Sequence, residues 1–252
     1  MLVWPLKATM NKKEKRENGF NKNETIGPSV AKLAVQLQFV PLYPELFEEA
    51  FTHSSYANEH KTDDNERLEF LGDSVLSLIA ASFLYRTFPN YHEGDLAKLK
   101  SIIVSTQVLA SFTKQLQLDT YLKLGTGEKR NMGQAKPTIL EDLFEAFVGA
   151  YYLNFGFEKT AQFIEPLIKD NLTEVKSKFT LINAKNELQE FLQSKGQFPE
   201  YCTIKEEGPP HQRRFTVEVL VENRTVGNGS GSSIKEAQNR AALQALSMLK
   251  EK

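Results

Sequence analysis

The spacing of apolar residues changes once along the chain, and this change restricts the possible folds more than any other feature of the sequence. Between residues 29 and 179 apolar residues recur with the period of a helix, most densely at residues 68–84, 101–118 and 139–152. No alternating strand pattern of any length interrupts this region. Later in the chain the period becomes two, because polar residues alternate with Phe215, Val217, Val219 and Val221. The pattern predicts an all-α domain followed by a domain that contains a sheet.

The second domain is expected over residues 184–252, in the order α-β-β-β-α. The pattern predicts a first helix at 186–195, strands at 201–206 and 215–222, a third short strand after a turn at 222–224, and a last helix at 233–249. This order is typical of a compact α+β module. Residues 173–183 are charged and poor in packing residues, which indicates a flexible linker after an all-α domain at 28–172. The expected fold class is multidomain, α followed by α+β.

Cysteine content and hydropathy argue against a disulfide-bonded secreted protein and against a membrane-spanning protein. The chain has 252 residues and a single cysteine, Cys202, so it cannot form an intramolecular disulfide, and we expect a cytoplasmic location. No apolar run approaches the roughly 20 residues of a membrane-spanning helix, so no membrane contact is expected. Residues 1–27 include a polar, lysine-rich stretch and predict a flexible tail. We hypothesise that Met10 is the native start, so a truncation lacking residues 1–9 should keep its activity.

The net charge conceals an uneven distribution. The chain carries 31 basic and 32 acidic residues, a net charge of −1, which taken alone argues against a nucleic-acid partner. By segment, however, the net charge is +3 over residues 1–27, −5 over 28–183 and +1 over 184–252. The excess of acid therefore lies in the all-α region.

Two expected helices carry acidic residues on one face. At 100° per residue, Glu66, Glu69 and Asp73 fall within an arc of roughly 60°. The second helix places Asp142 and Glu145 three residues apart between large apolar side chains. Thr138 and Glu141 have the spacing of a capping box, which would give Glu141 a structural role. Asp142 and Glu145 then require another explanation.

The simplest explanation is that these carboxylates lie on solvated helix faces. The apolar neighbours leave little room for such a face, among them Leu68, Phe70, Leu71, Leu143, Phe144, Phe147 and Val148. Partly buried carboxylates are tolerated where a cation neutralises them. An all-oxygen set without cysteine or histidine at ligand spacing favours Mg²⁺, or Mn²⁺ in its place, and such ions serve phosphoryl chemistry. His53 is interpreted as a packed histidine bonded to backbone, in preference to a general base.

The stretch Asn-Glu-Arg-Leu-Glu-Phe-Leu-Gly-Asp-Ser at residues 65–74 resembles the signature of bacterial ribonuclease III. Further blocks resemble this family in the same order, at residues 52–58, 93–95, 124–128 and 142–146. The resemblance implies that Glu69, Asp142 and Glu145 are metal ligands, with Glu145 and Asp73 acting in catalysis. It also implies that Glu66 and Glu93 line the substrate valley and support the site, and that no small-molecule cofactor is needed besides the metal.

The last domain has three features that suit a nucleic-acid duplex. Gln189 and Glu190 are exposed on its first helix, and a stiff loop at 207–212 projects His211. Ser233 and Glu236 have capping-box spacing, and the glycines before them are expected to leave open backbone for an anion. Together these features resemble a double-stranded RNA-binding domain. The resemblance implies minor-groove contacts by Gln189, Glu190 and His211, and phosphate contacts near Lys235.

The family's usual lysines are replaced in this last helix by Ile234 and Gln238. Because each missing phosphate contact reduces counterion release, we expect weaker binding and a shallower salt dependence than in relatives with these lysines.

The expected function is endonucleolytic cleavage of double-stranded RNA by metal-activated water, leaving 5′-phosphate and 3′-hydroxyl ends with a short 3′ overhang. Ribosomal precursors and other structured RNAs are the expected substrates, and RNA affinity should depend on Mg²⁺. The resemblance implies a homodimer with paired signature helices. Apolar residues also surround that helix too completely for one core, with Gly72 and Ser77 allowing close approach: Leu68, Leu71, Leu76, Ile79 and Phe83. The alternatives are a catalytically inactive RNA-binding paralogue and a nuclease for DNA or single strands.

Overall fold

The computed structural model describes residues 27–131, 136–209 and 212–250. Contacts divide the chain into two compact units, Met1–Lys169 and Asp170–Lys252. The expected tail, the Met10 start and His211 lie outside the described residues, apart from Gly27.

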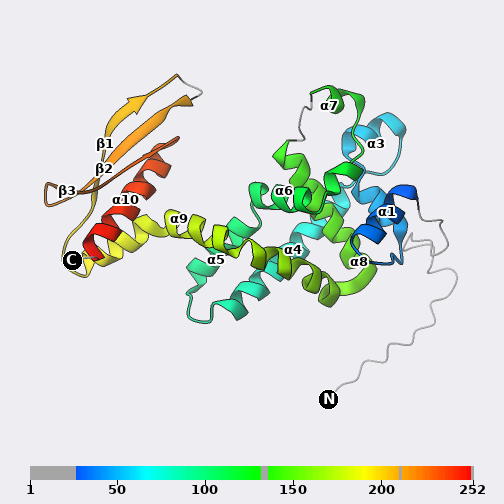
Figure 1. Ribbon diagram of the computed structural model, residues 1–252, viewed down its shortest axis with the longest axis horizontal. Coiled ribbons are helices and arrows are strands. Elements are labelled where there is room, and N and C mark those ends of the chain that lie inside the picture. Colours follow the sequence, from blue (N-terminus) through cyan, green and yellow to red (C-terminus); the bar gives the residue numbers. More distant parts are fainter. Residues whose placement is uncertain (1–26, 132–135, 210–211, 251–252) are drawn as a thin grey trace, which may run out of the picture. The chain divides into compact units, whose positions relative to one another are not determined.

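The first unit is helical, as predicted (Figure 1). Its elements are α1 (Pro28–Gln36), α2 (Pro44–Ala50), α3 (Ser54–His60), α4 (Glu66–Thr87), α5 (Glu93–Ile103), α6 (Thr106–Gln115), the 3₁₀ turn η2 (Leu118–Tyr121), α7 (Thr126–Asn131) and α8 (Pro137–Asp170). Among the described residues of this unit, the only β-type pairing is an isolated bridge between Thr52 and Lys123. The all-α class of this unit is therefore confirmed.

Aromatic side chains fill the centre of the first unit. The largest fully buried side chains include Phe47, Phe51, Phe112, Phe144 and Phe147. Burying each contributes about 1.5–3 kcal/mol relative to exposure. α8 supplies two of them and is broken further along at Gly156, where a φ of 79° is readily adopted only by glycine. α4 and α8 thus form the framework on which the acidic residues lie.

α4 packs differently from our expectation of a partner-facing surface. Four of the five apolar residues assigned to that surface lie in the core of their own unit: Leu68, Leu76, Ile79 and Phe83. The assignment of these four residues to a partner surface was wrong, because α5 and α8 pack against α4 within its own unit. The large apolar residues left exposed on α4 are Phe70, Leu78 and Tyr85, which are 78%, 55% and 75% exposed. We call these three residues the α4 outer stripe.

α4 also meets the length and hydropathy of a membrane-spanning helix, contrary to the expectation from apolar runs. It has 22 residues, of which eight are buried inside the unit. The core helices of soluble domains meet the same criteria. This finding is therefore weak evidence for a membrane span.

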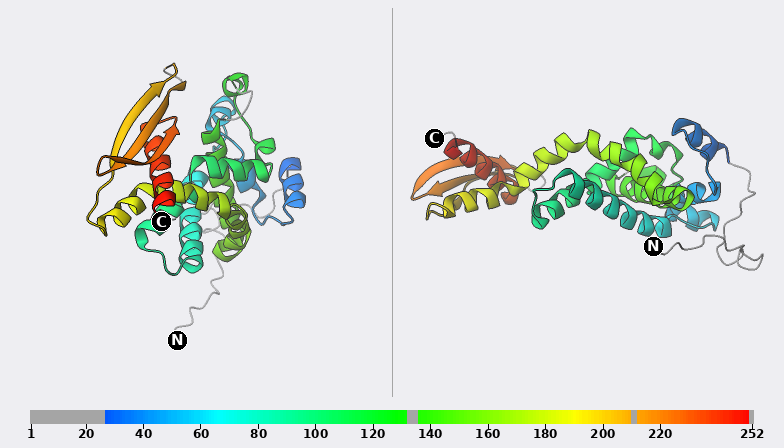
Figure 2. Two further views of the ribbon diagram at one scale, coloured as in Figure 1. Left: turned by 60° about the vertical axis from the view of Figure 1, so that its left-hand side comes forward. Right: turned by 90° about the horizontal axis from the view of Figure 1, so that it is seen from below.

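The second unit contains an antiparallel sheet in the order β1-β2-β3 with helices on one face (Figure 2). Its elements are α9 (Leu172–Gln193), β1 (Glu200–Glu207), β2 (Arg214–Val221), β3 (Arg224–Gly231) and α10 (Ile234–Lys250). The predicted order α-β-β-β-α is confirmed. The predicted inward residues of β2 are buried or half-buried.

The expected linker at 173–183 is helical, because α9 begins at Leu172 and runs through it. This stretch contains neither glycine nor proline to end a helix. Glu174 and Lys178 form an ion pair of 2.7 Å one turn apart, and Val175 is buried. The expected flexibility was wrong because charge and low apolar content do not by themselves break a helix, whereas the domain limits on either side stay a prediction.

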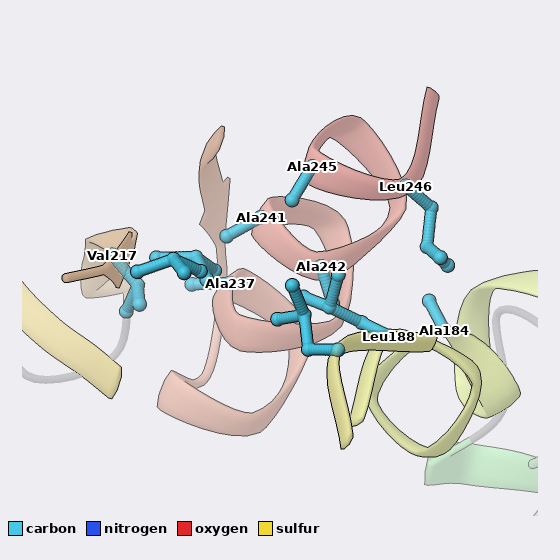
Figure 3. Close-up of a cluster of buried hydrophobic side chains, with 11 residues drawn as sticks. Ala184, Leu188, Val217, Ala237, Ala241, Ala242, Ala245 and Leu246 are labelled. Atoms are coloured by element: carbon cyan, nitrogen blue, oxygen red, sulfur yellow. The ribbon is translucent and has the colours of Figure 1, made fainter. Parts of the chain in front are cut away.

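The core of the second unit is formed by small side chains of α10 against the sheet and α9 (Figure 3). The glycines expected to leave open backbone instead lie in β3, under α10. A Cβ on Gly227 or Gly229 would stand 2.5 or 2.3 Å from main-chain atoms of Ala241. Gly227 and Gly229 therefore serve close packing of strand and helix, and they do not form an open anion site.

Candidate active site

α4 and α8 touch through their main chains at a pair of glycines. An ideal Cβ on Gly72 would lie 1.8 Å from the carbonyl oxygen of Glu145, and one on Gly149 would lie 2.3 Å from that of Leu68. No side chain larger than hydrogen fits at either position. The contact places the acidic residues beside Gly72 next to those of α8.

The raised pKa values of the carboxyl groups show which acidic residues the contact of α4 and α8 brings together. Burial, followed by repulsion from neighbouring carboxylates, raises the pKa of Glu145 to about 8. Those neighbours are Asp73, Glu141, Glu69 and Asp142. Burial and nearby acids raise the pKa of Glu69 to about 7, with Asp142 the largest of the charge contributions. We call Glu69, Asp73, Asp142 and Glu145 the acidic cluster.

The members of the acidic cluster differ in exposure. Asp73 is exposed, whereas Glu69, Asp142 and Glu145 are half-buried. Burial is also the main cause that raises the pKa of Asp142, followed by the charge of Glu141. The cluster therefore has a desolvated part and an open side.

The two supporting residues lie in different places. Glu66 is exposed at the start of α4, and its charge contributes to the raised pKa of Glu69. Glu93 lies at the start of α5 and lines a groove of about 790 Å³ with Tyr85 and Lys100. The part of α4 at this groove begins at Ala81, about 18 Å along the helix from Glu69. Within one chain, Glu93 is not part of the acidic cluster.

Glu141 also belongs to this electrostatic environment, although its spacing from Thr138 predicted only a structural role. Its charge raises the pKa of Glu69, Asp142 and Glu145. The predicted capping box of Thr138 and Glu141 was wrong, because α8 begins at Pro137 and Thr138 is already inside the helix. Leu140 donates its N–H to the Lys136 carbonyl. The spacing of Glu141 and Glu145, four residues apart on one helix, could have indicated this proximity.

His53 is packed against backbone, as predicted. It caps α3, and its Nδ1 accepts a hydrogen bond from the Ser55 N–H at 3.1 Å. In the neutral form of the ring, an accepting Nδ1 leaves the proton on Nε2. In the protonated form, the positive charge of His53 opposes the rise in the pKa of the Asp142 carboxyl.

The acidic cluster has the donor chemistry for a hard divalent cation. In the described part of the chain, no lysine or arginine forms an ion pair with Glu69, Asp142 or Glu145. No three acidic, histidine or cysteine side chains there converge closely enough to hold an ion as they stand. Half-buried carboxylates that repel one another would be stabilised by a cation, and their oxygens suit Mg²⁺ or Mn²⁺.

The second unit exposes most of the residues assigned to RNA. Gln189 and Glu190 are exposed on α9, opposite the buried Leu188, and Lys235 is exposed in the first turn of α10. Ser233 Oγ accepts from the Glu236 N–H at 3.2 Å, as expected for a cap. The return contact differs from a capping box, since Glu236 accepts from Ser232.

Comparison with known proteins connects both units to one class of enzyme. A family described as Ribonuclease-III-like matches residues 43–172, and the double-stranded RNA binding motif matches residues 184–249. With the fold and the acidic cluster, these matches define a two-domain RNA nuclease. Proteins named Ribonuclease 3 from Latilactobacillus sakei and Oceanobacillus iheyensis are 44% and 43% identical, over 81% and 80% of this chain and 90% of each relative. The chain belongs to the ribonuclease III family and is an endoribonuclease.

Solved structures agree with the fold of the first unit. Two structures of the nuclease domain of ribonuclease III from Campylobacter jejuni are 37% and 36% identical to this chain, each with a TM-score of 0.53. They cover 56% and 57% of this chain and 97% of their own. One of them is described as flexible in the region involved in dimer formation.

Proposed function

We propose that the protein cleaves both strands of double-stranded RNA with a divalent metal ion, Mg²⁺ or Mn²⁺, held by the acidic cluster. The observation that carries this proposal is the contact of Gly72 with the Glu145 carbonyl, since it holds carboxylates from two helices together. Family membership supports RNA as the substrate, and the RNA-binding motif supports a duplex.

Each acidic residue has a distinct part in this proposal. Glu69, Asp142 and Glu145 hold the ion, which on binding activates water and offsets phosphate charge. Asp73, exposed on the open side, orients the attacking water. Glu66 and Glu93 support the substrate. In-line attack on a phosphodiester by water, with no covalent intermediate, leaves a 5′-phosphate and a 3′-hydroxyl, and staggered cuts leave a short 3′ overhang.

The second unit positions the duplex in this proposal. Gln189 and Glu190 contact one minor groove, His211 contacts the next, and Lys235 contacts phosphates between them. A-form RNA suits such contacts because its minor groove is wide and displays 2′-hydroxyls. The proposed domain limits are residues 28–172 for the nuclease and 184–252 for the RNA-binding domain.

We also propose a homodimer, since two sites are needed to cut two strands together. The α4 outer stripe is the apolar surface that supports it, because its three large side chains are more than half exposed. The role of dimer formation in the Campylobacter jejuni nuclease domain gives further support. Processing of ribosomal precursors and other structured RNAs in the cytoplasm, without a membrane or further cofactor, completes the proposal.

The test compares a long RNA duplex with the matching DNA duplex and single strands, each with Mg²⁺ and with chelator. We expect cleavage of duplex RNA alone, only with Mg²⁺, and ends that carry 5′-phosphate. Equal cleavage of RNA and DNA would contradict the proposed specificity. Binding without cleavage would favour an inactive RNA-binding paralogue.

A further inference from the structure

A polar pocket of about 420 Å³ lies at one end of the sheet in the second unit. It is formed by the start of β2, the end of β3 and the first turns of α10. Three of the four arginines in residues 184–252 line it: Arg213, Arg214 and Arg240. Because unpaired cations repel one another, their convergence requires an explanation.

Carboxylates hold two of these arginines in place. Arg213 Nη1 donates to Glu206 at 2.7 Å, and Arg240 Nη2 donates to Glu236 at 2.7 Å. Glu236 is itself fixed by the N–H and hydroxyl of Ser232, each at 2.8 Å. A guanidinium has five N–H donors, so each arginine keeps donors for another acceptor.

Arg214 differs from the other two. Among the described residues, no carboxylate forms an ion pair with it, although it is exposed at the start of β2. The pocket lining contains three guanidinium groups and one carboxylate, that of Glu236. Because Glu206 and Glu236 offset the charges of Arg213 and Arg240, the excess is one positive charge, that of Arg214, beside oriented donors. These groups suit a phosphate because guanidinium binds phosphate through paired hydrogen bonds.

We propose that this arginine pocket binds a backbone phosphate of the RNA duplex, at a contact separate from that of Lys235. Lys235 and Arg240 are five residues apart on α10, so their directions differ by roughly 140°. Lys235 and Arg240 therefore point to different sides of α10 and can contact different phosphates. The inference rests on the proposed function, since it takes duplex RNA as the ligand.

The test measures duplex RNA affinity of the full-length protein in chelator, over a range of monovalent salt. Arg214→Ala should weaken binding roughly tenfold and reduce the salt slope by about one, as expected for a lost phosphate contact. Arg214→Lys should recover the slope but only part of the affinity, since lysine keeps the charge without the paired donors. Arg224→Ala is the matched control, because it removes the same charge at the opposite end of β3, about 23 Å along the strand.

Thermal stabilisation by inorganic phosphate separates this proposal from the proposed function. Wild type and Arg224→Ala should be stabilised by phosphate more than Arg214→Ala. If Arg214→Ala matches Arg224→Ala in RNA affinity and salt slope, the proposal is overturned. If Arg214→Ala then still loses its stabilisation by inorganic phosphate, the pocket binds phosphate but not that of RNA. If the wild type binds no duplex, the proposed function fails, and the phosphate response then shows whether the pocket binds phosphate from another source.

Discussion

Gly72 of α4 lies against the carbonyl oxygen of Glu145 in α8, at a distance where an ideal Cβ would stand 1.8 Å from that oxygen. Main-chain contact at this point places Glu69 and Asp73 beside Asp142 and Glu145. The proposed chemistry therefore depends on a residue that has no side chain.

Gly72→Ala should impair activity more than stability. A methyl group must push the two helices apart, which separates the members of the acidic cluster. We expect cleavage to fall roughly 100-fold, since displacements near 1 Å have such effects, and the free energy of unfolding to fall by about 1–3 kcal/mol. Single-turnover cleavage and thermal unfolding measure the two effects.

Gly94→Ala is the control for this change. It lies in the first turn of α5, and a Cβ there meets nothing within 4 Å. Its cleavage and stability should equal those of the wild type or exceed them slightly. Normal cleavage by Gly72→Ala would show that the helix contact does not control the site.

The metal-free protein should lose stability as pH rises from about 4.5 to 8. Glu69 and Glu145 have folded-state pKa values of about 7 and about 8, above the 4.5 of the unfolded chain. The folded state thus binds more protons in this window, and deprotonation favours unfolding. Mg²⁺ should oppose the loss, because it stabilises the charged carboxylates. Melting temperatures in chelator and in Mg²⁺ across this range test the sign, and a melting temperature that rises toward pH 8 in chelator would contradict it.

Glu145→Gln should abolish cleavage while duplex RNA affinity stays within about twofold of wild type in chelator. It removes a proposed ligand charge but leaves the second unit intact. The variant should also melt at higher temperature than wild type at pH 8 without metal, because it removes a repelled charge. Glu158→Gln, an exposed change in α8 beyond the break at Gly156, serves as control and should cleave normally. Metal-dependent cleavage by Glu145→Gln at nearly the wild-type rate would exclude Glu145 as a metal ligand.

Leu78→Glu should shift the protein from dimer to monomer. A carboxylate in the middle of the α4 outer stripe must lose its water when two stripes meet. Light scattering after gel filtration should give twice 28.6 kDa for wild type and 28.6 kDa for the variant. Val35→Glu places the same charge on an apolar residue of α1 that is 81% exposed, and it should remain dimeric. A dimeric Leu78→Glu would exclude this surface.

Periodicity was sufficient to predict the classes of both units. The spacing of Phe215, Val217, Val219 and Val221 predicted β2, because alternate residues of a strand face one side. The spacing of Glu66, Glu69 and Asp73 predicted an acidic helix face for the same kind of reason. Local spacing reports the direction of a side chain, and it therefore predicts amphipathic faces well.

Spacing does not report what covers a face. Gly72 was assigned to a partner contact, whereas it packs on α8 of the same chain. Gly227 and Gly229 of β3 were assigned to an anion site, whereas α10 covers them. Each error concerns a contact between segments far apart in sequence. Spacing also could not show that Glu93 lies away from the acidic cluster, because that position depends on where α5 packs.

The acidic cluster is proposed to hold the metal ion that the reaction requires, and anomalous scattering from crystals grown with Mn²⁺ would locate that ion. We expect a peak bounded by carboxylate oxygens of Glu69, Asp142 and Glu145 in the wild type, and its loss in Glu145→Gln. A Mn²⁺ peak elsewhere, with none at the acidic cluster in a protein that cleaves RNA with Mn²⁺, would contradict it.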